Sequence, residues 1–353
     1  MTMSFQNAFL GSLVADAVSM PVHWYYDVNS LDWDYGDFDH YLAPRNPHPD
    51  SILWRSKYEP IGEKDDILRE QAKHWGKPGL HYHQFLKVGE NTLNLQLACE
   101  LYREIIKQGK FDSDGWLERY AEVMLTPQWH NDTYAEEYHR AFFTNYARGK
   151  KLSACGIPDL HIGGLSLVPA LLAGLEAIGQ TDEDHLLEST RLLVKGTHDH
   201  PNTLGAARDL TRIIISLCKG TGVRNTLSDL QLSDVPLSSL KKWDNLPDRQ
   251  VVGKILSTAC YLPESFTASL YLAYKYEDDF TLAVLANAKV GGDNCHRGVV
   301  VGSVVGMQTG VPLKWLRDLK SLEGLSCELP SSCLLYTSPS PRDRTRSRMP
   351  PSA

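Results

Sequence analysis

Apolar side chains at helical spacing constrain the fold of this chain more than any other feature of its sequence. From Leu93 to Ile105, a leucine or isoleucine stands at every fourth position. That spacing places the apolar side chains on one face of an α-helix. Similar stripes cross the segments Leu210–Leu217 and Phe280–Ala288, whereas no segment shows the sustained alternation of a β-strand. The sequence therefore predicts an all-α fold.

Two further segments combine apolar residues with very small ones. Phe5–Met20 contains Ala15, and Val299–Gly310 contains Gly302 and Gly306. Small side chains let a second helix approach closely, because the distance between packed helices depends on the side chains at their contact. We expect both segments to be buried helices near the centre of the molecule.

The chain has 353 residues, and it shows no internal repeat and no convincing linker. We therefore expect one large, orthogonal multi-helix bundle over residues 1–325. Residues 31–64 and 220–247 lack a helical stripe, so we expect them to be irregular insertions. The first of them is rich in aromatic residues and proline, which favours an ordered surface excursion over disorder.

The composition changes after residue 325. Residues 326–353 are rich in serine, proline and arginine without helical periodicity, a composition typical of disorder. The string from Cys333 to Asp343, CLLYTSPSPRD, resembles the translation of a transposase-type sequencing adapter. We therefore expect this tail to be an artefact that replaces the native C-terminus. A natural disordered tail is the alternative, and resequencing the transcript across this junction distinguishes the two.

Charge and cysteine content argue against several classes of protein. The formal net charge is −7, whereas a nucleic-acid-binding surface carries a basic stripe. No run approaches the roughly 20 apolar residues that span a bilayer. The seven cysteines form no Cys-x-x-Cys pair, so we expect a cytoplasmic or other reducing intracellular compartment.

The most informative polar segment is the loop from Gly291 to Gly298. Within it, Asp293, Cys295 and His296 are all residue types that ligate metals. Polar groups at the mouth of a buried helix are costly unless they have partners, so we favour a functional site here over a simple turn with an Asp cap.

A second polar loop, Gly89-Glu90-Asn91-Thr92, precedes the leucine-rich helix. Oxygen ligands at a helix N-terminus suit a hard cation or a phosphate. Taken alone, the loop is better explained as a helix cap, in which Asn91 or Thr92 closes the helix and Glu90 interacts with its dipole.

Other polar residues are weaker candidates. Gly163 and Gly164 follow His161 and allow backbone N–H groups to face a phosphate or ribose, although a Gly-Gly turn is a weak signal. The His-x-His segment at 198–200 is better explained as the start of a helix, and the His-Tyr-His segment at 81–83 is a weaker candidate still. Asp16 interrupts an apolar helix, so it needs a partner, either structural or at the site.

The order of these pieces resembles the ADP-ribosylglycohydrolase family, which includes the dinitrogenase reductase-activating glycohydrolases. The shared elements, in chain order, are a small-residue helix with Asp16 followed by Pro21-Val22, an acidic loop before a leucine-rich helix, Gly163-Gly164, Thr-His-x-x-Pro at 197–201, and Gly-Gly-Asp at 291–293 before a small-residue helix. The resemblance implies an all-α bundle that removes ADP-ribose from protein side chains with two magnesium ions.

The metal-site motifs depart from the family pattern. The first loop reads Gly-Glu-Asn-Thr instead of Thr-Asp-Asp-Thr, and the last reads Gly-Gly-Asp-Asn-Cys-His instead of Gly-Gly-Asp-Thr-Asp-Thr. Asn91 and Cys295 each replace an Asp, and His296 replaces a Thr. His23 replaces the Glu that usually follows Pro-Val. Because magnesium prefers hard oxygen ligands, zinc, another transition metal or no metal are all open.

The resemblance leads to a specific set of expectations. The expected catalytic residues are Glu90, Asp293 and His23. The expected metal ligands are Glu90, Asn91, Asp293, Cys295 and His296. The expected substrate-binding residues are Gly163, Gly164, His161 and Asn294. We expect hydrolysis of a ribosyl bond in an ADP-ribosylated protein or a free ADP-ribose-type ligand. The alternative is a non-catalytic relative that binds ADP-ribose or has a structural role.

Overall fold

The computed structural model describes residues 4–230, 232 and 235–325. Over these residues the chain is all-α, as predicted, and forms isolated β-bridges but no β-strand. The α-helices, in chain order, are α1 Phe5–Ser19, α2 Val28–Tyr35, α3 Leu93–Gln108, α4 Ser113–Leu125, α5 Glu137–Ala147, α6 Val168–Ala177, α7 Glu183–Lys195, α8 Pro201–Cys218, α9 Val223–Leu230, α10 Leu237–Trp243, α11 Asp248–Gln250, α12 Glu264–Lys275, α13 Phe280–Lys289, α14 Asn294–Thr309, α15 Leu313–Leu316 and α16 Lys320–Leu325.

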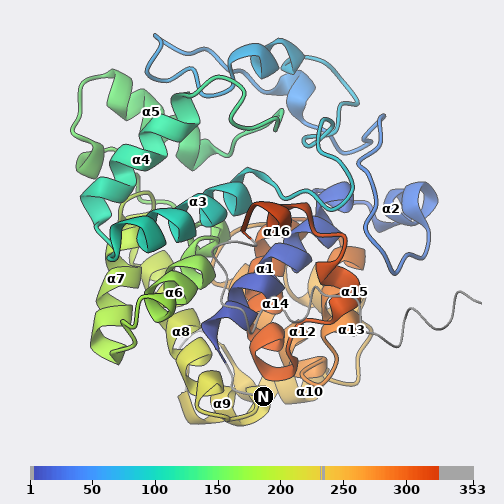
Figure 1. Ribbon diagram of the computed structural model, residues 1–353. Helices are drawn as coiled ribbons and strands as arrows, with labels where there is room; N and C mark the ends of the chain where they lie inside the picture. The colour runs from blue at the N-terminus through green and yellow to red at the C-terminus, as the bar shows by residue number, and fades with distance from the viewer. Residues whose placement is uncertain (1–3, 231, 233–234, 326–353) are drawn as a thin grey trace, which may run out of the picture.

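Helices α1 and α14 form the centre of the bundle, and nearly all of their residues are buried (Figure 1). They cross at Gly11 and Gly302. A Cβ added to Gly11 would lie 2.1 Å from the carbonyl oxygen of Gly302, and one added to Gly302 would lie 2.2 Å from that of Gly11. No side chain fits there, so the predicted pair of buried small-residue helices is confirmed, with a physical reason for both glycines.

The remaining helices surround this pair. Helix α6 packs against both α1 and α3, and α8 contacts α7 and α14. On the opposite side of the centre, α12 and α13 pack against α14 (Figure 1). The apolar stripes predicted at Leu93–Ile105, Leu210–Leu217 and Phe280–Ala288 fall in α3, α8 and α13, and each contributes to the main hydrophobic core.

The two segments expected to be irregular differ in the structure. Residues 31–35 of the first segment lie in α2, so that part of the expectation was wrong. Residues 36–64, and the chain on to residue 92, run mainly as loops over one end of the bundle, with short 3₁₀ turns such as η2 Leu53–Arg55 and η3 Arg69–His74 (Figure 1). By contrast, the segment 220–247 contains the short helices α9 and α10. Each of these helices is too short to show an apolar stripe over several turns, which explains why periodicity missed them.

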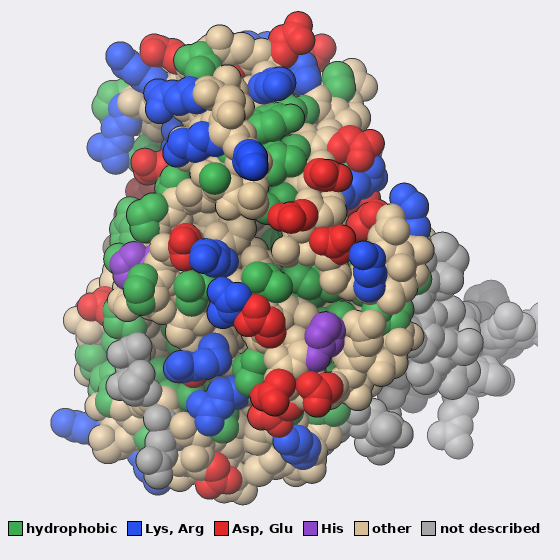
Figure 2. All heavy atoms as spheres, turned by 90° about the vertical axis from the view of Figure 1, so that its left-hand side faces the viewer, with side chains coloured by type: hydrophobic (Ala, Val, Ile, Leu, Met, Phe, Trp, Pro, Cys, Tyr) green, Lys and Arg blue, Asp and Glu red, His purple; other side chains and the backbone are tan. Residues whose placement is uncertain are grey.

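The molecular surface and the helix lengths add two observations. On the face that Figure 2 shows, acidic and basic side chains are interspersed. Among the described residues, none of the helices combines the length and apolar character needed to cross a membrane. The tail at 326–353, which the sequence predicts to be disordered, lies outside the described residues.

Candidate functional site

Asp293 occupies the N-cap position of α14, directly after a turn that requires glycine twice. Gly291 and Gly292 have φ angles of +70° and +66°. A Cβ on Gly291 would lie 2.3 Å from the carbonyl oxygen of Tyr25, and one on Gly292 would lie 2.3 Å from that of Thr258. Positive φ and close backbone approach are both conditions that favour glycine. The turn therefore packs closely against the backbone at Tyr25 and Thr258, and the Asp293 side chain is buried in the protein.

The carboxylate of Asp293 is buried and held by three donors on one oxygen. Oδ1 lies 2.9 Å from Nε2 of His23, 3.0 Å from Nε1 of Trp24 and 2.7 Å from Nδ1 of His296. Oδ2 is equally buried and accepts no hydrogen bond from any described residue. Burial by itself would raise the pKa of this carboxyl, but the neighbouring His296 charge and hydrogen bonds hold the pKa well below its usual value.

His296 lies between two carboxylates. Its Nδ1 contacts Asp293, and its Nε2 lies 3.2 Å from Oε1 of Glu136 and 2.8 Å from Nδ2 of Asn94. Burial would lower the pKa of His296, but the charges of Asp293 and Glu136 raise it to about 10. The arrangement is thus an imidazolium flanked by two anions, which is how a fully buried charge becomes tolerable.

Glu136 is the N-cap residue of α5 and one wall of the largest cavity near the site. Its Oε2 is buried and accepts no hydrogen bond within the described chain, although Nε2 of His139 lies 3.7 Å away. Burial would raise the pKa of Glu136, yet the hydrogen bond and charge of His296 lower it. Glu136 and Asp293 therefore share a cation, and each keeps one unused carboxylate oxygen.

A second chain of polar groups continues from His23. Its Nδ1 lies 2.7 Å from Nε2 of His83, whose Nδ1 lies 2.6 Å from Oδ1 of Asp132. The other oxygen of Asp132 accepts the backbone N–H of Leu93 at the start of α3. Burial lowers the pKa of His23 to about 3 despite its bond to Asp293. Burial would lower the pKa of His83, but the charge and hydrogen bond of Asp132, together with the charges of Asp16 and Glu136, raise it.

The cavity next to Glu136 has a volume of about 470 Å³. Its lining residues are Trp24, Tyr26, Asp50, Ile52, Arg55, Tyr82, Tyr134, Glu136, Glu137, Asp159, His161, Ala259, Cys260 and Tyr261. Aromatic walls and acidic groups dominate this set. A ligand atom from each of His161, Cys260 and Asp293 lies within 4.8 Å of the other two, so Asp293 lies directly behind the cavity wall.

The glycine pair of the third motif packs beneath this wall. Nδ1 of His161 accepts the N–H of Gly163 at 2.8 Å. A Cβ on Gly163 would lie 2.8 Å from the hydroxyl of Tyr138, and one on Gly164 would lie 2.9 Å from the ring of His198. The structure thus places His161 at the cavity and uses both glycines for close packing behind it.

Asn294 is fully buried beside the site. Its Nδ2 donates to the carbonyl oxygens of Val22 and Ala288 at 3.0 Å each, and its Oδ1 has no hydrogen-bond partner among the described residues. These bonds join the end of α13 to the turn that carries His23. Asn294 therefore holds the backbone around the site, and it does not line the cavity.

The first loop is engaged elsewhere. The carboxylate of Asp16 accepts Nδ2 of Asn91 at 2.8 Å, the N–H of Thr92 at 2.9 Å and the hydroxyl of Thr92 at 2.7 Å. Glu90 is half-buried, and its Oε2 accepts the N–H of Lys87 at 2.8 Å. Asp16 thus has the structural role, and the caps of α3 come from Asp16 and Asp132 rather than from the loop's own side chains.

These bonds decide whether a two-magnesium centre fits. The oxygens of Asp16 and one oxygen of Asp293 already accept several hydrogen bonds, and Glu90 bonds to its own turn. The groups of described residues that approach metal-ligand spacing are His23–His83–Cys295, His23–Asp293–His296 and His161–Cys260–Asp293. Magnesium requires an octahedron of oxygens, whereas these sets are rich in imidazole and thiol. A two-magnesium centre does not fit this chain.

Sequence reasoning missed Glu136, Asn94 and Asp132, and it ranked His83 low. Asp132 and Glu136 lie in the polar connection between α4 and α5, which carries no motif. Asn94 lies inside the first turn of α3, where it looks like an ordinary polar position. The one signal in the sequence was its thirteen histidines. The structure shows that nine of them are buried.

Comparison with known proteins agrees with the fold. The sequence matches the model of the ADP-ribosylglycohydrolase family over residues 3–338. A solved structure described as an ADP-ribosylglycohydrolase-related protein complex is similar, with a TM-score of 0.56 and 20% identity over 91% of this chain and 95% of that one. At this identity the likeness shows the fold alone. No curated protein matches the sequence. The resemblance inferred from the motif order is confirmed.

Proposed function

The chain belongs to the ADP-ribosylglycohydrolase family, and from this premise we propose that it hydrolyses the glycosidic bond of an ADP-ribosyl group in the cavity beside Glu136. The observation that carries the proposal is the pair of buried carboxylates that share His296. Asp293 and Glu136 each bond to one nitrogen of that ring and each keep one oxygen without a partner. Unused buried carboxylate oxygens are costly unless a ligand or water takes them.

Paired carboxylates suit glycoside hydrolysis, because the transition state is an oxocarbenium-like cation that anions stabilise. Glu136 lines the cavity, and we propose that its carboxylate orients the attacking water or stabilises the ribosyl cation. Asp293 lies behind the wall, and we assign it, with His23, to holding His296 in place. This assignment moves the catalytic role from Glu90, whose carboxylate bonds to Lys87.

The lining of the cavity supports one class of substrate. Aromatic side chains such as Trp24 and Tyr82 offer flat apolar faces for a nucleobase. Among the lining residues, the carboxylates of Asp50, Glu137 and Asp159 accompany Glu136, whereas Arg55 is the one cation. Because this surrounding is acidic, it favours a cationic acceptor, so we propose an ADP-ribosylated arginine over a serine.

The test compares release of ADP-ribose from peptides modified on arginine and on serine, with and without chelator. We expect faster release from arginine peptides, and no loss on adding magnesium chelators. Glu136→Gln should lower release at least about a hundredfold, whereas Glu137→Gln, a matched change on the neighbouring lining residue, should leave kcat largely intact and raise mainly the KM for arginine peptides. Absence of release from both peptides, with the protein folded, would overturn the proposal.

A specific observation favours the alternative of a non-catalytic ADP-ribose-binding relative. The first loop and Asp16 satisfy each other, so the region that holds metal in the family pattern is closed by internal bonds. Calorimetry with free ADP-ribose separates the two functions: heat of binding without turnover supports the binding protein, and turnover supports the hydrolase.

A further inference from the structure

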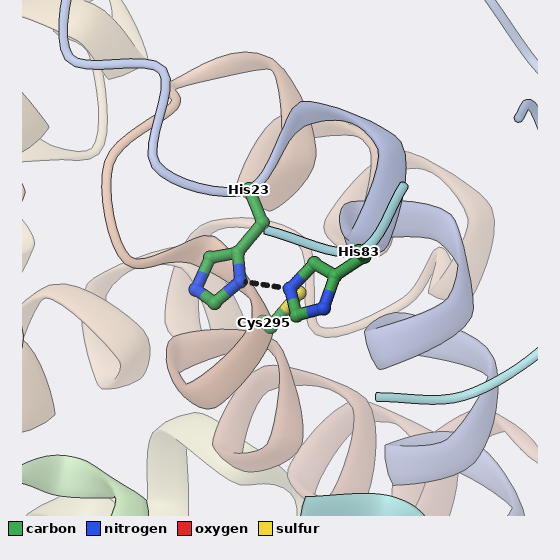
Figure 3. A group of neighbouring side chains, drawn as sticks. All are labelled: His23, His83 and Cys295. Atoms are coloured by element: carbon green, nitrogen blue, oxygen red, sulfur yellow. Dashed lines mark hydrogen bonds between the residues drawn. The ribbon is translucent and has the colours of Figure 1, made fainter. Parts of the chain in front are cut away.

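We propose that this protein binds one zinc ion through Nδ1 of His23, Nε2 of His83 and Sγ of Cys295, in a buried site separate from the catalytic carboxylates. The three side chains come from distant parts of the sequence and point toward one another (Figure 3). The test of this site does not depend on the proposed hydrolase activity, because it measures the metal content of the resting protein.

The donor atoms have the spacing that a single ion needs. Nδ1 of His23 and Nε2 of His83 lie 2.7 Å apart, and all three donor atoms lie within 4.8 Å of one another. In zinc sites, nitrogen and sulfur ligands stand about 2.0–2.3 Å from the ion. Ligands around one ion then lie somewhat farther apart than a hydrogen bond, so a slight opening of the His23–His83 contact admits the ion.

The outer nitrogens of both imidazoles are already oriented by carboxylates. Nδ1 of His83 bonds to Asp132 at 2.6 Å, and Nε2 of His23 bonds to Asp293 at 2.9 Å. Histidines that ligate zinc commonly donate their other N–H to a carboxylate, which fixes the tautomer and increases ligand basicity. Asp132 is itself held by the first N–H of α3.

The buried charges around the site favour a bound cation. Zinc with the Cys295 thiolate carries one net positive charge, and the buried anions Asp132 and Asp293 lie one hydrogen bond beyond its ligands. The imidazolium of His296 lies between Asp293 and Glu136 and offsets one of these two anions, so the buried surroundings keep a net negative charge that favours a bound cation. By contrast, a thiolate alone would be unfavourable here, because burial raises the pKa of Cys295 well above its usual value. The soft nitrogen and sulfur donors suit zinc and do not suit magnesium.

A bound zinc would also act on the proposed active site through His23. With Nδ1 on the metal, the neutral ring must carry its proton on Nε2, which donates to Oδ1 of Asp293. The ion would thereby hold Asp293 in its anionic, oriented form. His23 and His83 are then positioning residues, because neither side chain lines the cavity itself.

The experiment measures metal in the full-length protein, purified without chelator from zinc-supplemented medium. We expect about one zinc per chain, with three protein ligands and the fourth tetrahedral position open to water. Cobalt(II) loaded during refolding should give a sulfur-to-cobalt charge-transfer band together with intense tetrahedral d–d bands. His83→Gln and Cys295→Ser should each lower zinc content to roughly a tenth or less, because one lost ligand weakens such a site strongly.

Cys260→Ser is the matched control, since Cys260 is the thiol of the other cysteine-containing cluster, with His161 and Asp293. It should retain zinc and the cobalt charge-transfer band. Circular dichroism on every variant shows that loss of metal is not loss of fold. A folded wild type without zinc or cobalt bands overturns the site. So does retention of zinc in Cys295→Ser, or its loss in Cys260→Ser alone.

Discussion

The two polar loops, at residues 89–92 and 291–298, have similar sequences but differ in whether their polar groups find partners within the protein. In the first, the Asn91 and Thr92 groups bond to Asp16, and Glu90 bonds to Lys87. In the last, Asp293 and His296 belong to a buried network that leaves carboxylate oxygens unused. The first loop fastens α3 to α1, whereas the last loop presents charge beside a cavity.

A polar loop before a helix can act as a site only where some of its groups keep no partner within the protein. Asp16 accepts the hydrogen bonds of the first loop, so the donors of that loop are not available to a ligand. The last loop has an anion, Asp293, whose partners are two histidines and a tryptophan, and its second oxygen has none among the described residues. Four substitutions test this contrast, from the largest expected effect to the smallest.

Asp293→Asn should have the largest effect. It removes the negative charge that three donors share and leaves the His296 cation only partly compensated. Breaking a buried ion pair costs about 3–5 kcal/mol of stability, and ADP-ribose release should fall at least about a hundredfold. Urea unfolding and the peptide assay measure the two effects. Unchanged activity in a folded variant would remove the last loop from the chemistry.

Glu136→Gln should lower kcat by a factor on the order of 10²–10⁴ with a small change in KM, as for loss of a positioned acid–base group. The same variant tests a pH dependence. The interactions of Glu136 with His296 lower its pKa below the ordinary value of 4.5, so its charged form contributes stability to the fold above that pH.

That stabilisation is lost as the pH falls through the lowered folded-state pKa. The free energy of unfolding of the wild type should therefore decrease more steeply than that of Glu136→Gln between about pH 5 and about pH 3. Denaturant titrations at several pH values measure both slopes. Equal slopes would contradict the assigned environment of Glu136.

Asp16→Asn should destabilise the protein and spare its activity. Asparagine offers one acceptor oxygen in place of two, so a donor of Asn91 or Thr92 loses its partner. An unsatisfied buried group costs about 1–3 kcal/mol, whereas kcat should change less than about threefold. A large loss of kcat at unchanged stability would place Asp16 in the active site and erase the contrast between the loops.

Glu90→Gln should have the smallest effect. The amide oxygen of glutamine can still accept the N–H of Lys87, and the side chain is only half-buried. We expect stability within about 0.5 kcal/mol of the wild type and activity within the error of the assay. A tenfold loss of activity would instead return Glu90 to the catalytic role expected from the sequence.

The helices that cross at the centre were predictable in detail. Their evidence is local: apolar residues recur at helical spacing, and small residues such as Gly302 mark a close crossing. The last loop was also recognisable, because metal-type ligands stand beside two glycines in a short stretch. Helices α9 and α10 were missed, since two turns of helix carry too few apolar positions to establish a period.

The helical class, the central pair α1 and α14 and the position of the loop around Asp293 thus follow from the amino-acid sequence alone. Which side chains meet that loop depends on the packing of the helices. Glu136 and His83 lie far from it in sequence, and they reach it because α3, α5 and α14 begin at the same place in the bundle. Periodicity reports which face of a helix is buried, but the partners of a buried charge depend on how the helices pack.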